Sequence, residues 1–211
     1  MNIRKFVVSQ FGNPEGLFGK LAGYIMSTRP SNIERSDWGI SLLDIQPTDN
    51  VLEIGFGPGI AILKMSALTN DGMIYGIDHS ELMCSQATKT NMQAIEQGKV
   101  KLFHTSVATL PPFEQRLDKI LDVNSFQFWE QPVEWLAALR AVMNEDGVIA
   151  LVHQPRKPGA TEADSEQAGK SFSAYLAQAG FQEITVERKP MKPVSVICIL
   201  GRNVPKHPQE T

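Results

Sequence analysis

The ten residues VLEIGFGPGI, at positions 51 to 60, constrain the fold of this chain more than any other segment. Three glycines alternate along it, between an apolar run typical of a buried strand and a run with helical spacing. Because glycine lacks a Cβ atom, it adopts positive φ readily and lets a ligand approach the backbone closely. The free N–H groups at the start of the following helix would point toward that ligand. The segment therefore predicts a cofactor-binding unit of strand, loop and helix.

A second apolar run, at residues 73–77, ends in Asp78, about twenty residues beyond Gly59. A carboxylate at the end of the neighbouring strand can accept hydrogen bonds from both hydroxyl groups of a ribose. Asp is also a favoured N-cap residue, so a helix cap is the local alternative. Ile60 stands where the dinucleotide fingerprint G-x-G-x-x-G requires glycine or alanine. The loop therefore departs from the pattern of a nicotinamide site.

Strand-like runs alternate with helical runs along the rest of the chain, which predicts the α/β fold class with a parallel sheet. The last two strand-like runs are joined only by RKPMKP, which is too short for a crossover helix, so we expect them to pair antiparallel. The expected strands are residues 51–54, 73–77, 100–105, 119–124, 148–153, 181–187 and 194–201. The expected helices include residues 132–144 and a segment that begins at Thr161 or Asp164 and ends at Ala179.

With Glu53, Gly55, Gly57, Gly59 and Asp78 in this order, the chain resembles a class I S-adenosylmethionine-dependent methyltransferase. The first motif of that family is an acid followed by G-x-G-x-G, and the second is an acid that ends the next strand. The resemblance extends to about Gly201 and is greatest to small bacterial enzymes that act on lipids, quinones and other metabolites. It places later motifs at 108–113 and at a NEDG turn, residues 144–147. It implies a Rossmann-like three-layer α/β/α sandwich of seven strands, the last one reversed.

The resemblance also implies S-adenosyl-L-methionine as cofactor, with S-adenosyl-L-homocysteine as product and no metal. The glycine loop would surround the methionine end, with Glu53 supporting the loop or the ammonium group. Asp78 would bind the ribose, His79 would lie along the adenine, and Ser80 would cap the next helix. Many relatives have an adenine-binding Asp where this chain has Ser106. The implied cofactor-binding residues are Glu53, Gly55, Phe56, Gly57, Gly59, Asp78, His79, Ser106, Val107 and Asn124.

The acceptor site is expected after the fourth strand, where Phe126, Phe128 and Trp129 suggest an apolar or aromatic metabolite or lipid-like acceptor. Packing in the core is the alternative for these rings. The motif N/D-P-P-Y/F is absent there, which disfavours methylation of DNA bases or glutamine. In the family a preceding region commonly covers the active site, which makes Tyr24, Met26, Arg29 and Trp38 further candidates for substrate contact. Packing on the sheet is the alternative for these four residues.

The domain organisation follows from these motifs. We expect an N-terminal helical lid or extension at residues 1–45, the cofactor-binding domain at 46–201, and a tail at 202–211. Within the extension, Ser31 and Glu34 are typical of a capping box for a helix that ends at Leu43, with Trp38 and Leu42 facing inward.

Composition narrows the function classes. A chain of 211 residues with 42% hydrophobic residues suffices for one well-buried domain, and a net charge of -3 gives no field that attracts nucleic acid. No apolar run is long enough for a membrane span and no signal peptide is indicated, so a cytoplasmic location is expected. Cys84 and Cys198 lack metal-site spacing and are expected to be buried, reduced thiols.

Other chemistry finds little support in the sequence. None of the four histidines can be named as a general base, and GKS at 169–171 is a chance tripeptide within a helix. The alternatives are an NAD(P)-dependent oxidoreductase and a catalytically inactive nucleotide-binding relative. Ile60 and the terminal antiparallel pair argue against the oxidoreductase. The acceptor and the oligomeric state stay open.

Overall fold

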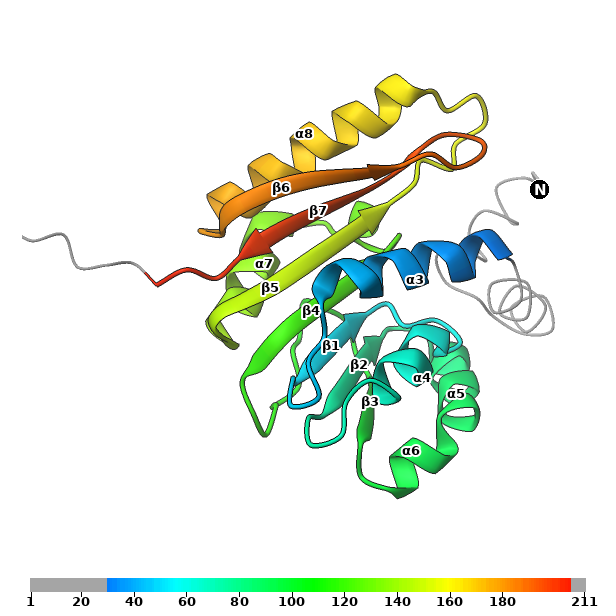
Figure 1. Ribbon diagram of the computed structural model, residues 1–211, viewed down its shortest axis with the longest axis vertical. Coiled ribbons are helices and arrows are strands. Elements are labelled where there is room, and N and C mark those ends of the chain that lie inside the picture. Colours follow the sequence, from blue (N-terminus) through cyan, green and yellow to red (C-terminus); the bar gives the residue numbers. More distant parts are fainter. Residues whose placement is uncertain (1–29, 206–211) are drawn as a thin grey trace, which may run out of the picture.

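A seven-stranded sheet with helices on both faces forms the molecule in the computed structural model, which describes residues 30–205 (Figure 1). The first five strands in the chain are parallel, and β7 is antiparallel to both of its neighbours, β5 and β6. The order across the sheet is β3-β2-β1-β4-β5-β7-β6. The strands are β1 (Val51–Ile54), β2 (Ile74–Asp78), β3 (Val100–His104), β4 (Leu117–Val123), β5 (Met143–His153), β6 (Gln182–Lys189) and β7 (Val196–Arg202).

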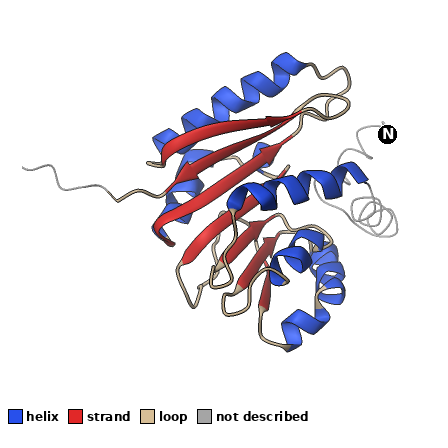
Figure 2. Ribbon diagram, viewed as in Figure 1, coloured by secondary structure: helices blue, strands red, loops and turns tan. Residues whose placement is uncertain are grey.

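Two groups of helices make the outer layers, so the predicted three-layer sandwich is confirmed (Figure 2). One face of the sheet carries α3 (Pro30–Leu43), α4 (Ile60–Ser66), α5 (Glu81–Thr90) and α6 (Met92–Glu96). The other face carries α7 (Pro132–Ala141) and α8 (Glu162–Gln178). A single 3-10 turn, η1 (Phe126–Phe128), follows β4.

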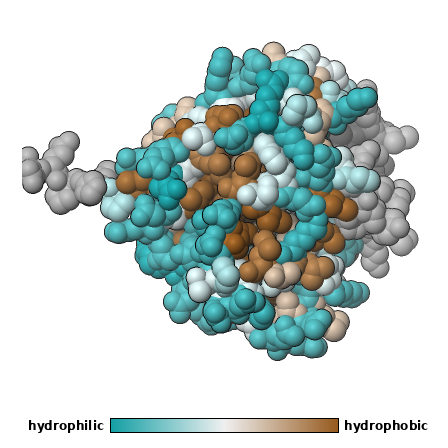
Figure 3. All heavy atoms as spheres, viewed as in Figure 1, coloured by the Kyte–Doolittle hydropathy of each residue, from teal (hydrophilic) through white to brown (hydrophobic). Residues whose placement is uncertain are grey.

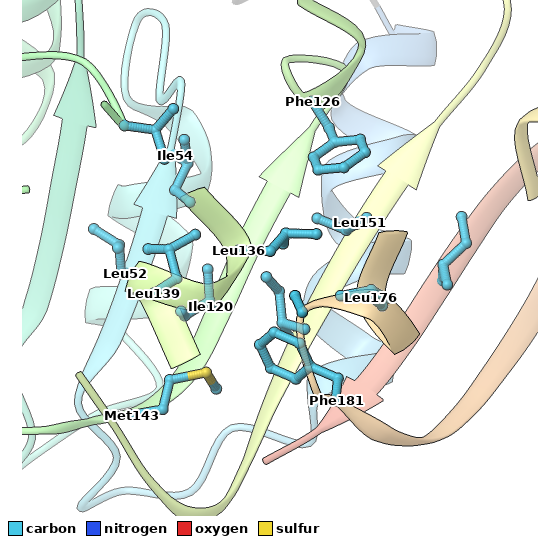
Figure 4. Close-up of a cluster of buried hydrophobic side chains, with 14 of the residues drawn as sticks. Leu52, Ile54, Ile120, Phe126, Leu136, Leu139, Met143, Leu151, Leu176 and Phe181 are labelled. Atoms are coloured by element: carbon cyan, nitrogen blue, oxygen red, sulfur yellow. The ribbon is translucent and has the colours of Figure 1, made fainter. Parts of the chain in front are cut away.

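The core divides into two clusters because successive side chains of each strand point to opposite faces. Leu52, Ile54, Ile120 and Leu151 pack under α7 and α8, against Leu136, Leu139, Leu176 and Phe181 (Figure 4). Each fully buried Leu or Ile stabilises the fold by about 1.5–3 kcal/mol. Every residue of β1 and β2 is buried, as expected for central strands that are covered on both faces.

Helix α3 lies directly on β4 and β5. Gly39 permits this approach, because a Cβ atom there would lie 2.7 Å from Val152 Cγ2. The predicted capping box at Ser31 is wrong, since the helix already begins at Pro30, a residue suited to a first helical turn. Trp38 and Leu42 are half-buried and pack on the sheet as predicted, while the fully buried line runs through Arg35, Gly39 and Leu43.

The predicted NEDG turn is a bulge inside β5, because the pairing with β4 jumps from Leu117↔Met143 to Lys119↔Val148. Residues 144–147 form this bulge, and Asp146 has a φ of 61°. Helix α7 consequently ends at Ala141, three residues before the predicted end at Asn144. The sequence places helix and strand correctly and misjudges the boundary between them.

Both residues predicted as possible starts of α8, Thr161 and Asp164, take part in its N-terminal cap. Thr161 is the N-cap, and its backbone N–H donates to Asp164 Oδ2 at 2.8 Å, which completes a capping box. GKS at 169–171 lies in the middle of this helix, as predicted.

Hydrophobic side chains gather over β5 and β7 between α3 and α8, with hydrophilic ones around them (Figure 3). Val148 and Leu200, both half-buried, pack on the α3 side of the sheet. Within residues 30–205, no helix has the length and apolar character needed to cross a membrane.

Candidate functional site

The glycine loop joins β1 to α4 at the carboxyl edge of the sheet. Gly55, Gly57 and Gly59 have φ values of 69°, 53° and 81°, a region that other residues rarely adopt. A Cβ atom on Gly55 would lie 2.7 Å from Ser125 Cβ, and one on Gly59 would lie 2.6 Å from Asn91 Nδ2. A Cβ atom on Gly57 would meet nothing within 4 Å. Gly55 and Gly59 are therefore required by packing, whereas Gly57 faces open space where a ligand can approach the backbone.

Asp78 ends β2 and holds the glycine loop in place. Its Oδ2 accepts from the Gly57 backbone N–H at 2.9 Å, and its Oδ1 accepts from the Ser80 N–H at 2.9 Å. Burial raises the pKa of Asp78, and these two N–H groups with His79 and His104 oppose the rise. The alternative of Asp78 as a helix cap is wrong, because Ser80 is the N-cap of α5, as the resemblance implied. Each carboxylate oxygen retains a lone pair for another donor.

Glu53 lies in β1 directly beneath this loop, with a residue exposure of 3%. Its Oε2 is buried and has no hydrogen-bond partner. Burial, and then the negative charges of Asp78 and Asp122, raise the pKa of Glu53 well above its ordinary value, while the Ile62 backbone N–H lowers it in part. A buried acceptor without a donor is costly, so this carboxylate fits a site that receives a cationic or hydrogen-donating ligand.

Asp122 is a third buried acid, on β4, and it was not predicted from the sequence. Its Oδ1 accepts from the backbone N–H groups of Ser125 at 3.1 Å and Phe126 at 3.0 Å, and its Oδ2 accepts from the Ser125 hydroxyl. Burial raises the pKa of Asp122 to about 6 despite these three donors. A lone Asp inside an apolar strand run, as in KILDVN, is the sequence signal that could have identified it.

Asn124 and Ser125 connect the carboxyl ends of β1, β4 and β5. Asn124 has a φ of 60°, and its side-chain Oδ1 accepts from the Gln154 backbone N–H at 2.8 Å. The Ser125 hydroxyl lies 3.3 Å from the Ile54 carbonyl oxygen. The side chain of Asn124 therefore serves the fold, and its backbone carbonyl accepts from Gln127 Nε2 at 3.2 Å.

The residues expected at adenine surround the ends of β2 and β3. His79 is exposed, and the ring nitrogen Nε2 of His104 lies 3.0 Å from its backbone oxygen. Ser106 is exposed and Val107 is buried in the core next to it. Phe56, in the glycine loop, turns its ring into the opposite core cluster.

The expected acceptor residues separate into two groups. Phe126 belongs to the core (Figure 4). The centroid of its ring lies 4.8 Å from the ring centroid of Trp129 and 4.5 Å from that of Phe172. Trp129 is half-buried beside it, and Phe128 is 62% exposed. The core alternative therefore applies to Phe126, while Phe128 and Trp129 keep surface that a ligand can reach. Tyr24, Met26 and Arg29 lie outside the described residues.

Arg35 of α3 is the second residue that the sequence analysis missed. It is buried, with 2% exposure, and its Nη1 donates to Gln154 Oε1 at 2.5 Å, next to the carboxyl end of β5. Its Nη2 donates to Asn32 Oδ1. Both acceptors are neutral amide oxygens, and Arg35 Nε is buried without a partner. An arginine four residues before Gly39, on the inward line of a predicted helix, was the available signal.

Acid-base and metal chemistry have few other candidates among the described residues. His153 is buried beside Phe172, and burial lowers its pKa to about 4, so it is neutral near pH 7. The thiols of Cys84 and Cys198 are free, Cys84 being half-buried and Cys198 buried. In residues 30–205, no group of three or more His, Cys, Asp or Glu side chains could hold a metal ion.

The chain is similar to a methyltransferase domain family and to a relative that is named as a methyltransferase. Residues 51–147 match the family model described as a methyltransferase domain. An uncharacterized methyltransferase of Bacillus subtilis (strain 168), YdaC, is 29% identical over 182 residues, which cover 86% of this chain and 97% of that protein.

Solved structures of other proteins share the fold of this chain. A SAM-dependent methyltransferase from Aquifex aeolicus superposes with a TM-score of 0.65 and 19% identity, covering 83% of this chain and 94% of its own. The N-methyltransferase NodS from Bradyrhizobium japonicum WM9, solved with S-adenosyl-L-homocysteine, gives a TM-score of 0.67 at 15% identity and covers 84% of this chain and 90% of its own.

Proposed function

We propose that this chain is a class I S-adenosylmethionine-dependent methyltransferase and that it methylates a small apolar or aromatic acceptor held over the carboxyl ends of β4 and β5. The observation that carries the proposal is the unpartnered, buried Oε2 of Glu53 beneath the open backbone of Gly57. A positively charged ligand with an amino acid end can donate a hydrogen bond from its ammonium group to this oxygen.

Electrostatics support a cationic cofactor over a dinucleotide. Glu53, Asp78 and Asp122 come from three adjacent strands, and burial raises the pKa of each. A nearby positive charge favours the ionised form of all three, whereas a pyrophosphate would add like charge to them. The third glycine of the dinucleotide fingerprint is also missing, since Ile60, the first residue of α4, occupies its position. This argues against the alternative of a nicotinamide-dependent oxidoreductase.

The proposed roles of the chain are binding and orientation. When bound, S-adenosylmethionine supplies a methyl carbon that its positive sulfur already activates. Gly57 offers its backbone to the methionine end, and Asp78 accepts the ribose hydroxyls while it keeps its hydrogen bonds to the Gly57 and Ser80 N–H groups. Asp122 fixes the turn at Ser125 and so sets where an acceptor over β4 can lie. Holding the acceptor in line with the transferred methyl is the main requirement for rate.

The acceptor side rests on the surface that Phe128 and Trp129 leave accessible. Aromatic rings at the edge of a site provide a large apolar contact area for a small ligand. No protein base is assigned, because an acceptor oxygen or nitrogen that loses its proton readily needs none.

Two measurements test the proposal. Calorimetry with S-adenosylmethionine, S-adenosylhomocysteine, NADH and NADPH should give saturable binding for the first two compounds only. Incubation with methyl-labelled cofactor and a cell metabolite extract should then place label in a small organic molecule. Binding of a nicotinamide dinucleotide alone, or label found only in protein or nucleic acid, would contradict the proposed activity.

A further inference from the structure

We propose that the Ser125 hydroxyl is a two-position link between the glycine loop and the turn η1, and that a proton on Asp122 decides its position. Ser125 and Asp122 are then positioning residues, because they act through the turn that carries Phe128 and Trp129. This inference rests on the proposed function, since it concerns the two halves of that same site. It adds that the charge of the bound cofactor changes how the acceptor side is held.

Asp122 holds the turn η1 as one unit. Its Oδ1 accepts from the backbone N–H groups of Ser125 at 3.1 Å and Phe126 at 3.0 Å. The Ser125 carbonyl oxygen accepts from the Phe128 N–H at 2.9 Å. The Phe126 carbonyl oxygen accepts from the Trp129 N–H at 3.1 Å. A displacement of Ser125 relative to Asp122 therefore moves the residues that carry both accessible rings.

The side chain of Ser125 also lies directly against the glycine loop. Its Oγ is 3.3 Å from the carbonyl oxygen of Ile54, the residue before Gly55. A Cβ atom on Gly55 would lie 2.7 Å from Ser125 Cβ and 2.8 Å from Ser125 Oγ, so no free space separates the two segments. On its other side, Gly55 donates its N–H to the Ile77 carbonyl oxygen at 2.8 Å. A change at Ser125 therefore alters the surroundings of the glycine loop, and the reverse also holds.

The Ser125 hydroxyl has one hydrogen and two acceptors within reach, Asp122 Oδ2 and the Ile54 carbonyl oxygen. When Asp122 is ionised, the carboxylate is the stronger acceptor, so the hydroxyl donates to Oδ2. When Oδ2 carries a proton, Asp122 donates to Ser125 Oγ and the hydroxyl donates to Ile54. The protonated arrangement is therefore the one in which a hydrogen bond from Ser125 joins the turn to β1.

The surroundings of Asp122 make both arrangements accessible near neutral pH. Asp122 is buried, and no ion pair involves it among residues 30–205. Burial raises the pKa of Asp122 to about 6, although the hydrogen bonds from Ser125 and Phe126 oppose the rise. Asp122 is therefore mainly protonated at about pH 5 and mainly ionised at about pH 7.

Two titratable side chains belong to the strands on either side of Asp122. On β1, the negative charge of Glu53 interacts with that of Asp122. On β5, His153 has a pKa of about 4, so it stays neutral as Asp122 titrates. Asp122 follows Ile120 by two residues and lies on the same face of the sheet (Figure 4). The helices α7 and α8 contribute to this face the side chains of Leu136, Leu139, Tyr175 and Leu176. Glu53 is thus the group whose titration must be separated from that of Asp122.

A bound cation should bias the link. A positive charge favours the ionised form of a nearby carboxyl group. S-adenosylmethionine differs from S-adenosylhomocysteine by the positive charge on its sulfur as well as by the methyl group. Asp122 should therefore lose its proton at a lower pH with the first ligand than with the second. The fraction of Ser125 that donates to Ile54 should rise once the sulfur is neutral, so the turn distinguishes cofactor from product.

The test follows Trp129 by fluorine NMR in the full chain labelled with fluorotryptophan. The Trp129 resonance is assigned by its loss in Trp129→Phe, and Trp38 on α3 is an internal reference. In the free protein, the Trp129 resonance should shift with pH around a midpoint of about 6. Saturation with S-adenosylmethionine should lower this midpoint by at least about 0.5 pH unit relative to saturation with S-adenosylhomocysteine. A resonance that does not shift with pH, or equal midpoints with the two ligands, would overturn the proposal.

Variants identify the groups that cause the shift. Asp122→Asn keeps the neighbouring acids and should abolish the shift of Trp129, because an amide does not titrate. Ser125→Ala keeps the charge of Asp122 and should reduce the shift at least threefold, because the hydroxyl is lost. The matched control is Ser165→Ala, in which a buried hydroxyl that donates to the Ser195 carbonyl oxygen at 2.9 Å is removed; its Trp129 shift should equal that of the wild type. A full shift in Asp122→Asn or in Ser125→Ala would overturn the proposal.

A measurement in the native chain covers the case in which a variant does not fold. The carboxyl carbon of Asp122, assigned through its own backbone amide, should titrate with the same midpoint as the fluorine of Trp129. Midpoints that differ by more than about one pH unit would overturn the link. Failure of both S-adenosyl compounds to bind would instead contradict the proposed function, so the two failures are distinguishable.

Discussion

Gly57→Ala separates the conformational role of a glycine from its role in ligand contact. Gly57 has a φ of 53°, and a Cβ atom added there would meet nothing within 4 Å. Gly98, between α6 and β3 at the opposite edge of the sheet, has a φ of 74° and the same free surroundings. Each Ala variant therefore bears the same strain, about 1–2 kcal/mol for a left-handed residue, and no clash. Both should lower Tm by a few degrees, at about 2–4 °C per kcal/mol.

Affinity for the cofactor should distinguish the two variants. If the methionine end of S-adenosylhomocysteine lies against Gly57, the new methyl group overpacks the contact, which costs about 1–3 kcal/mol. That corresponds to a 5- to 150-fold weaker Kd by calorimetry, whereas Gly98→Ala should bind as the wild type does. Equal affinity of the two variants, with equal losses of Tm, would refute the placement of the cofactor on this loop.

Three further outcomes are expected. Asp78→Ala should weaken cofactor binding in calorimetry more than Ser106→Ala does, because only the first removes a charged acceptor; equal Kd values would contradict the ribose role. The pKa of Asp122, about 6 in the folded state, exceeds its unfolded value near 3.9, so this group stabilises the fold below pH 4, and the stabilisation, about 3 kcal/mol at most, is lost as pH rises through 6. Asn does not titrate, so the free energy of unfolding of Asp122→Asn, measured in denaturant, should decrease less between pH 4 and pH 6 than that of the wild type. An equal decrease in both proteins would refute the prediction. Phe128→Ala should reduce turnover of the acceptor while Tm stays within about 1 °C, since the ring is 62% exposed; unchanged kinetics would remove Phe128 from the site.

The sheet could be predicted because its determinants are local. Runs of apolar β-branched residues gave all seven strands, and the short linker RKPMKP required an antiparallel pair at the end. The glycine loop was equally clear, since three alternating glycines after a strand leave few other conformations.

The two residues that were missed each left a partial signal in the sequence. The place of Arg35 on the inward line of a helix indicates burial, but its partner Gln154 is 119 positions away and only the fold brings the two together. A lone Asp in an apolar run indicates that Asp122 is a buried acid, but its bonds to the turn at Ser125 and Phe126 depend on how the chain leaves β4. The bulge at residues 144–147 arises from pairing with β4, so local turn propensity alone misjudged the end of α7. Contacts between distant segments thus decided the surroundings of Arg35 and the end of α7.

The hydrogen bond from the Gly57 N–H to Asp78 has a kinetic consequence. Because the carboxylate already fixes the backbone of the loop, an arriving ligand need not order that segment, and little conformational entropy is lost on association. Amide hydrogen exchange at Gly55, Gly57 and Gly59, whose N–H groups are all hydrogen-bonded, should therefore be slow in the free protein and change little at saturation. The association rate should not be limited by rearrangement of the loop.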